Sequence, residues 1–186
     1  MADQTRAIRT PEEFQALDAL YQMSFGEASV PTATLRAWHE AYPQGLIGLF
    51  EGSQLVGGIS VWALRESAYA QFSQGGIKER ALSAADLAPE GGSFFYLSEI
   101  AVYPGRGSRA RLLALLDAMM AHLSLYGRFP LQVLGLAYSN EGMRIMQRLG
   151  FMPWLSAEET ADGLPMLRWE APLATAFQGL LGKRGR

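Results

Sequence analysis

The spacing of hydrophobic residues along the chain alternates between the repeat of a helix and the shorter repeat of a strand. Residues 10–13 combine a threonine, a proline and two glutamates in the pattern of a helix N-terminus. Hydrophobic residues then recur at helical spacing, which predicts a first helix to about residue 24. A second helix is predicted over residues 34–42, where it ends before a proline.

The strands are predicted from runs of aromatic and β-branched residues between turn residues. The run from Phe94 to Tyr103 is rich in aromatic and β-branched residues and ends at Pro104, as a buried strand should, and a helix follows from about Ser108. The other predicted elements are strands at 46–50, 55–62, 131–138, 151–155 and 165–169, and a helix at 142–149. This order predicts a mixed α/β domain built around one sheet.

The segment at residues 65–92 has no clear periodicity, because glycines and Pro89 interrupt short helical pieces. A connection of this length is often a lid or a binding loop, and an insertion without a role fits the pattern as well. We expect residues 1–186 to form a single domain, with a frayed basic tail at residues 173–186.

Composition removes several classes of function. The chain has no cysteine and two histidines, which excludes a thiolate nucleophile, a disulfide framework and a cysteine or histidine-rich metal centre. A formal net charge of −2 gives no excess of basic residues of the kind that binds nucleic acid. The N-terminus lacks the hydrophobic stretch of a signal peptide, and no run is long enough to span a bilayer. We therefore expect a cytoplasmic protein that binds no metal, no nucleic acid and no membrane.

The turn between the Phe94–Tyr103 run and the following helix has the chemistry of a phosphate site. Backbone N–H groups at a helix start bind anions, and Arg106, Arg109 and Arg111 lie beside them. Positive charge at this end opposes the helix dipole unless an anion is bound, which favours a ligand over plain surface charge.

Glu99 lies inside the predicted hydrophobic central strand, where a carboxylate is costly to bury unless it is paired or reaches water. One interpretation is a general base whose pKa is raised by burial. The other is a structural ion pair with an arginine, and the sequence leaves both open. Asn140 precedes a predicted helix and is a good N-cap residue.

Three segments together resemble the GNAT superfamily of acyl-CoA-dependent N-acyltransferases: GLFEGSQLVGGISVW, SEIAVYPGRGSRARLLALL and AYSNEGMRIMQRLGF. The resemblance covers residues 46–169. It implies a mostly antiparallel central sheet that is flanked by helices and whose two central strands splay apart. It also implies that acyl-CoA, most simply acetyl-CoA, lies in the gap between those strands.

The resemblance assigns roles to individual residues. The backbone of Ile100, Ala101 and Val102 would pair with the pantetheine arm, and Asn140 would contact the same arm. The pyrophosphate would be held by the turn formed by Arg106, Gly107, Ser108, Arg109, Ala110 and Arg111, although this turn matches the family pattern only loosely. Met146 stands where many members carry a tyrosine that protonates the leaving thiolate. Tyr138, Ser139 and Tyr103 are the candidate replacements.

The implied activity is transfer of an acyl group from acyl-CoA to a primary amine, with Glu99 as the base and Tyr138 as the substitute acid. The acceptor would be a small-molecule or peptide amine between the N-terminal helices and residues 65–92, with Trp38, Tyr42 and Phe72 as wall residues. A homodimer is a further possibility, since dimers are common in the family.

Two other functions remain open. One is a non-catalytic acyl-CoA sensor or interaction domain, in which Met146 marks lost chemistry. The other is a dinucleotide-binding protein, because residues 105–110 fit G-x-G-x-x-A after a strand. That motif normally has an acidic residue at the end of the next strand, and the segment 131–138 has none.

Overall fold

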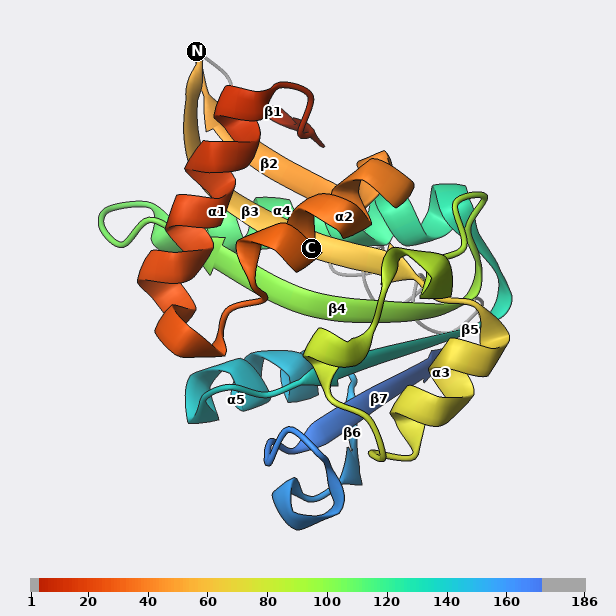
Figure 1. The fold of residues 1–186 in the computed structure, drawn as a ribbon. Coiled ribbons are helices and arrows are strands. Elements are labelled where there is room, and N and C mark those ends of the chain that lie inside the picture. The colour runs from red at the N-terminus through yellow and green to blue at the C-terminus, as the bar shows by residue number, and fades with distance from the viewer. Residues whose placement is uncertain (1–3, 172–186) are drawn as a thin grey trace.

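The computed structural model describes residues 4–171, which form a seven-stranded sheet in the order β1-β2-β3-β4-β5-β7-β6 (Figure 1). All neighbouring strands are antiparallel except β4 and β5, which are parallel. The prediction of a mixed, mostly antiparallel sheet is therefore confirmed. The strands are β1 Gln4–Ala7, β2 Leu46–Glu51, β3 Gln54–Ala63, β4 Gly92–Val102, β5 Gly127–Leu136, β6 Met152–Leu155 and β7 Met166–Ala171.

Helices cover both faces of this sheet. Helices α1 and α2 cross its front face in Figure 1, and α4 lies behind it. Leu17 of α1 packs so close to Gly58 that a side chain at Gly58 would overlap its methyl group. The helices are α1 Pro11–Phe25, α2 Thr32–Ala41, α3 Glu66–Ser73, α4 Ser108–Tyr126 and α5 Asn140–Arg148.

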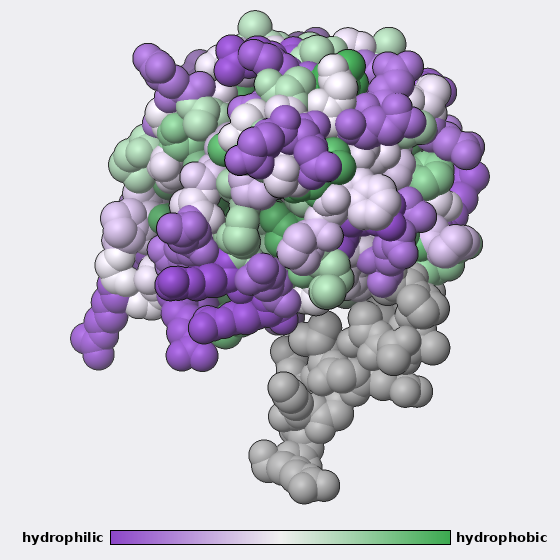
Figure 2. Space-filling view, turned by 90° about the horizontal axis from the view of Figure 1, so that it is seen from below, coloured by the Kyte–Doolittle hydropathy of each residue, from purple (hydrophilic) through white to green (hydrophobic). Residues whose placement is uncertain are grey.

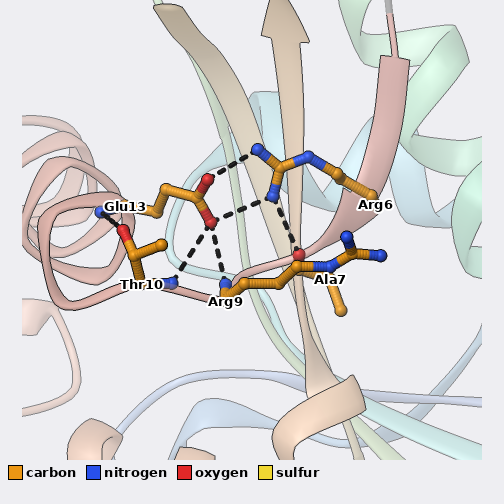
Figure 3. A network of polar contacts seen from close by, with 5 residues as sticks. All are labelled: Arg6, Ala7, Arg9, Thr10 and Glu13. Atoms are coloured by element: carbon orange, nitrogen blue, oxygen red, sulfur yellow. Dashed lines mark hydrogen bonds and ion pairs between the residues drawn. The ribbon is translucent and has the colours of Figure 1, made fainter. Parts of the chain in front are cut away.

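A polar network joins the first strand to the first helix (Figure 3). The Glu13 side chain completes a capping box with Thr10. The Arg6 guanidinium donates hydrogen bonds of 2.5 and 3.0 Å to the two carboxylate oxygens of Glu13, and the Arg9 amide donates another of 2.8 Å. These donors lower the pKa of Glu13 to about 2. The network fixes β1 at the edge of the sheet beside the start of α1.

The predicted elements are all present, with bounds that differ by a few residues. The sequence did not predict β1 or α3, and α3 lies within the irregular segment 65–92. Helix α5 begins at Asn140 because Ser139 is its N-cap: the Ser139 hydroxyl accepts a 3.0 Å hydrogen bond from the Gly142 amide. The expected basic tail at residues 173–186 lies outside the described residues.

The surface at the β6–β7 end of the sheet is mainly hydrophilic, with hydrophobic residues in small separate patches (Figure 2). Among residues 4–171, none of the helices has the length and hydrophobicity needed to cross a membrane.

Candidate functional site

Strand β4 contains a bulge at the centre of the sheet. Ile59 of β3 pairs with Ile100, but Val61 pairs with Leu97, so Ser60 faces both Ser98 and Glu99. An extra residue on one strand bends that strand and increases its twist. The bulge therefore changes the direction of β4 at Glu99, which is the single glutamate in this strand.

The two central strands separate directly after this bulge. Strands β4 and β5 pair as far as Leu97 and Gly135, and beyond this point β4 continues without β5 beside it. Figure 1 shows the two ribbons diverging toward α5. The predicted splay is therefore present.

A mostly hydrophobic cavity of about 250 Å³ occupies this opening. We call it the inter-strand cavity. Its walls come from β4, β5, α4 and α5, together with Phe25 at the end of α1. The lining residues are Phe25, Leu97, Ser98, Ile100, Ala101, Val102, Leu112, Leu116, Leu136, Tyr138, Ser139, Glu141, Gly142, Ile145, Met146 and Leu149. The structure thus brings Ile100, Ala101 and Val102 together along one wall.

Leu112, near the N-terminus of α4, lines this cavity, so the start of the helix lies close to it. Gly105 and Gly107 in the preceding turn have φ angles of +135° and +91°, a region of backbone conformation that favours glycine. Within residues 4–171, no side chain caps this N-terminus, and its first turn contains no acidic residue. Arg106 and Arg109 are exposed beside it. The arrangement is suited to binding an anion.

Arg111 is held differently from the other two arginines. Its guanidinium forms a 2.7 Å ion pair with Glu51 at the end of β2 and donates a hydrogen bond to the Tyr103 carbonyl. The structure therefore places Arg111 in a contact between α4 and the sheet. A role in binding a phosphate would require it to leave Glu51.

Glu99 is 2% exposed and reaches from the bulge to the connection between α1 and α2. Its Oε1 accepts hydrogen bonds from the Ser29 hydroxyl at 2.7 Å and from the Val30 amide at 3.1 Å. Its Oε2 is buried and has no hydrogen-bond partner in the described residues. Burial raises the pKa of Glu99 to about 7, against the two hydrogen bonds that lower it. The arginine partner that a structural ion pair would need is absent from these contacts.

A second cavity of about 240 Å³ lies on the Ser29 side of this carboxylate. We call it the polar cavity, and it is lined by Ala28, Ser29, Pro31, Glu79, Arg80, Tyr138, Asp162 and Leu164. Tyr138, which follows β5, is the one residue that lines both this cavity and the inter-strand cavity. The two cavities therefore lie on either side of Tyr138.

Glu79 is the buried carboxylate of the polar cavity. It is 5% exposed and accepts hydrogen bonds from the hydroxyls of Tyr96 and Tyr138. Burial is the largest effect on its pKa, which is raised to about 7. Within residues 4–171, no group of three or more histidine and acidic side chains is arranged to hold a metal ion.

Comparison with solved structures finds the same architecture in other proteins. Ard1 from Thermoplasma volcanium is 15% identical, with 92% of this chain and 99% of that chain covered at a TM-score of 0.64. The GphF GNAT-like decarboxylase, in complex with isobutyryl-CoA, is 17% identical, with coverage of 90% and 98% and a TM-score of 0.62. The loading GNATL domain of CurA from Lyngbya majuscula is 14% identical, with coverage of 91% and 98% and a TM-score of 0.61.

This is the GNAT fold. At the level of sequence, no family model matches the chain, and no curated protein matches it significantly. The GNAT fold thus rests on the three-dimensional likeness, and the activity has to be argued from the residues of this chain.

Three residues that were predicted to contact the acceptor substrate lie in the hydrophobic core. Trp38, Tyr42 and Phe72 are at most 1% exposed, and none of them lines either cavity. The Trp38 indole donates to the Leu82 carbonyl, the Tyr42 hydroxyl is 3.0 Å from a ring nitrogen of His122, and Phe72 packs edge-on against Tyr96. The structure places all three in the core and gives no support to the prediction that they form a substrate wall.

Two other predicted positions differ in detail. Asn140 is exposed at the first residue of α5, and its neighbours Ser139 and Glu141 line the inter-strand cavity in its place. Met146 is buried, lines the same cavity and packs its terminal methyl group against Gly135. It brings no exchangeable proton to the cavity, so the thiolate of a bound donor would depend on another side chain.

Sequence reasoning did not find Ser29, Glu79 or Asp162. Glu79 lies between Lys78 and Arg80, so it reads as one charge in an exposed run. Its partners Tyr138 and Asp162 lie 59 and 83 residues further along the chain. Only the fold brings these groups to one cavity.

Proposed function

We propose that this protein is an N-acyltransferase that moves an acyl group from acyl-CoA to a primary amine by direct attack on the thioester. One observation carries the proposal: a hydrophobic cavity between splayed strands and a polar cavity that contains two carboxylates share Tyr138 as a lining residue. A reaction between two substrates needs such an arrangement, with the reacting atoms held near each other.

The inter-strand cavity has the features that an acyl-CoA requires. The edge of β4 beyond Leu97 is free of β5, so its backbone is available to the amides of a pantetheine arm, as an added strand would be. The α4 N-terminus with Arg106 and Arg109 is available to the pyrophosphate. Backbone donors in the region of Ile100 to Val102 would polarise the thioester carbonyl.

The polar cavity suits an amine. Two carboxylates, Glu79 and Asp162, line it beside one cation, Arg80, and carboxylates favour a cationic ammonium group. Ser29 lines the same cavity and donates its proton toward Glu99. A hydroxyl can accept a proton from an ammonium while passing its own to a carboxylate, so Ser29 would connect Glu99, which lines neither cavity, to the acceptor. A carboxyl with a pKa of about 7 is well matched to this proton transfer.

The reaction then follows from these positions. Glu99 takes a proton from the ammonium through Ser29, and the free amine attacks the thioester carbon. A C–N bond forms, the C–S bond of the tetrahedral intermediate breaks, and the thiolate leaves. Tyr138, which lines both cavities, would deliver a proton to the thiolate. A thiol has an ordinary pKa of about 8.5, so this help accelerates the step without being obligatory.

The test combines binding and turnover. Acetyl-CoA should raise the melting temperature, since a ligand that binds only the folded state stabilises it. A panel of small amines and peptides with free amino termini should release thiol from acetyl-CoA, and Glu99→Gln should abolish this release while keeping the thermal shift. Glu90→Gln, which changes an exposed glutamate outside both cavities, is the matched control.

A non-catalytic acyl-CoA sensor is the second candidate, and Met146 is the observation that favours it. A thermal shift with acetyl-CoA and no thiol release across the whole panel would support the sensor and contradict the acyltransferase. A shift with NAD or NADP and none with CoA would support dinucleotide binding instead.

A further inference from the structure

We propose that Glu79 and Tyr138 form a second proton path, which takes a proton from the acylated nitrogen and returns it to the leaving thiolate. The inference rests on the proposed acyltransferase function and extends it to a residue of the irregular segment 65–92. In this path Tyr138 is the group that touches the substrates, and Glu79 is the residue that positions it and holds the proton.

The first support is the geometry around Glu79. The Tyr138 hydroxyl donates to Oε2, and the Tyr96 hydroxyl donates to Oε1 at 2.5 Å. The Glu79 amide donates to Oδ2 of Asp162 at 2.9 Å, which fixes the backbone of the short helix at residues 79–81. Both carboxylate oxygens are thus engaged, and the whole group is anchored to β4, to the end of β5 and to the loop before β7.

The second support is the place of the Tyr138 hydroxyl. It belongs to the residue shared by the two cavities, whereas Glu79 lines only the polar cavity. Met146 cannot donate a proton in the inter-strand cavity, and of the residues that line this cavity Tyr138 alone also lines the polar cavity. Its hydroxyl would therefore serve the nitrogen on one side and the sulfur on the other. Glu99 would serve the nitrogen separately, through Ser29.

The proton count requires a second path. A primary ammonium loses two protons when it becomes an amide, and the thiolate gains one. The first proton goes to Glu99 before attack. The second leaves the nitrogen of the tetrahedral intermediate for the Tyr138 oxygen, as the Tyr138 proton moves to Glu79. When the C–S bond breaks, Glu79 returns this proton through Tyr138 to sulfur, and both side chains regain their starting states. Glu99 releases the remaining proton to solvent.

The charges around Glu79 suit a group that must both accept and return a proton. Burial raises its pKa to about 7, and the nearby carboxylates Glu99 and Asp162 act in the same direction. The hydroxyls of Tyr96 and Tyr138 act against this shift. The cation Arg80 lines the same cavity. The pKa of Tyr138 is itself raised by burial and by Glu79, so the phenol passes a proton on rather than staying ionised.

The test is the dependence of kcat on pH, which reports groups that titrate in the substrate complex. With acetyl-CoA and a saturating amine, the wild-type protein needs both Glu99 and Glu79 ionised. Its kcat should therefore fall about 100-fold per pH unit well below pH 7. Glu79→Gln and Tyr138→Phe should each lower kcat at pH 8 by about 10²- to 10⁴-fold. The fall in acid should become about tenfold per pH unit in both variants, since one carboxylate no longer takes part.

Tyr69→Phe is the matched control. It removes a tyrosine hydroxyl that is also buried, has no hydrogen-bond partner in the described residues and lines neither cavity. This variant should keep the wild-type kcat at pH 8 and the same decrease of kcat with falling pH. Melting temperatures of all variants are measured alongside, and if one of the two test variants does not fold, the other decides.

The outcomes are distinguishable. If the wild-type protein is active and kcat of both test variants still falls about 100-fold per pH unit in acid, Glu79 has only a structural role. The inference is then overturned, and the proposed acyltransferase function stands. If the wild-type protein binds acetyl-CoA but releases no thiol with any amine, the proposed function is overturned and the inference with it.

Discussion

The hydroxyl of Ser29 lies 2.7 Å from Oε1 of Glu99 and donates a hydrogen bond to it across 70 positions of the chain. This contact joins the α1–α2 connection to the bulge of β4. Ser29 lines the polar cavity, and Glu99 lies behind it without lining either cavity. A buried carboxylate thereby gains access to a cavity through a single hydroxyl.

Ser29→Ala should reduce activity because it removes the link between the amine and Glu99. We expect kcat to fall by about 10²-fold or more, in the range of general base catalysis. Ser29→Thr, which keeps the hydroxyl, should restore most of the rate, as measured by thiol release at pH 8. Ser124→Ala removes a hydroxyl on the exposed side of α4 and serves as the control. Equal activity in Ser29→Ala and the wild type would show that Glu99 does not act through Ser29.

The raised pKa of Glu99 predicts how stability depends on pH. The folded protein holds this carboxyl at a pKa of about 7, compared with an ordinary value of 4.5. The stability it contributes is fully present below about pH 4.5 and is lost as pH rises through about 7. A shift of this size corresponds to about 3 kcal/mol.

Glu99→Gln removes the titrating group, so the free energy of unfolding should fall less between pH 5 and pH 8 than in the wild type. Urea denaturation at the two pH values measures the difference. Glu79 titrates in the same range, and therefore a smaller decline remains in this variant. The same decline in the variant and the wild type would contradict the raised pKa of Glu99.

The exposed arginines at the start of α4 should contribute to binding the phosphates of an acyl-CoA donor and not to binding its thioester. Arg106→Ala and Arg109→Ala should each raise KM for acetyl-CoA several-fold, because each removes a charge-assisted contact. The KM for S-acetylpantetheine, which has no phosphate, should stay unchanged. Arg128→Ala is the control, since Arg128 is exposed beyond the opposite end of α4. Equal effects on both donors would place the pyrophosphate elsewhere.

The sequence was sufficient for most of the architecture because the central elements are strongly patterned. A carboxylate inside the hydrophobic run of β4 is conspicuous, and Glu99 was found for this reason. The glycines of the turn before α4 and the divergence of β4 from β5 were also expected. Strand β1 was not, because it is a four-residue edge strand with polar and charged side chains.

The acceptor side could not be predicted from the sequence. Aromatic residues at helical spacing, such as Trp38 and Tyr42, satisfy their own polar atoms inside the core, and this outcome is more common than a ligand wall. Ser29 and Glu79 carry no local signal, since their roles arise from contacts with Glu99 and Tyr138 across the fold. Periodicity identifies the scaffold, and only the folded chain places its polar side chains relative to one another.

The network around Glu13 predicts a second, opposite dependence on pH. Arg6 and the amides at the helix start hold the pKa of Glu13 at about 2, compared with an ordinary value of 4.5. The stability that it contributes is present above about pH 4.5 and is lost as pH falls toward 2. Glu13→Gln should lower the free energy of unfolding by about 1–2 kcal/mol at pH 7, since a charged capping partner is lost.

This destabilisation should shrink at pH 3, because the same carboxyl in the unfolded chain, with its ordinary pKa of 4.5, is protonated there and part of the contribution is lost. Chemical denaturation of both proteins at pH 7 and pH 3 measures the change. Glu90→Gln, at an exposed position away from any helix start, should leave the free energy of unfolding within about 0.5 kcal/mol of wild type. A Glu13→Gln effect of the same size at both pH values would mean that the side chain contributes through packing alone. In that case the ion pair with Arg6 would add nothing measurable, as holds for many ion pairs near a protein surface.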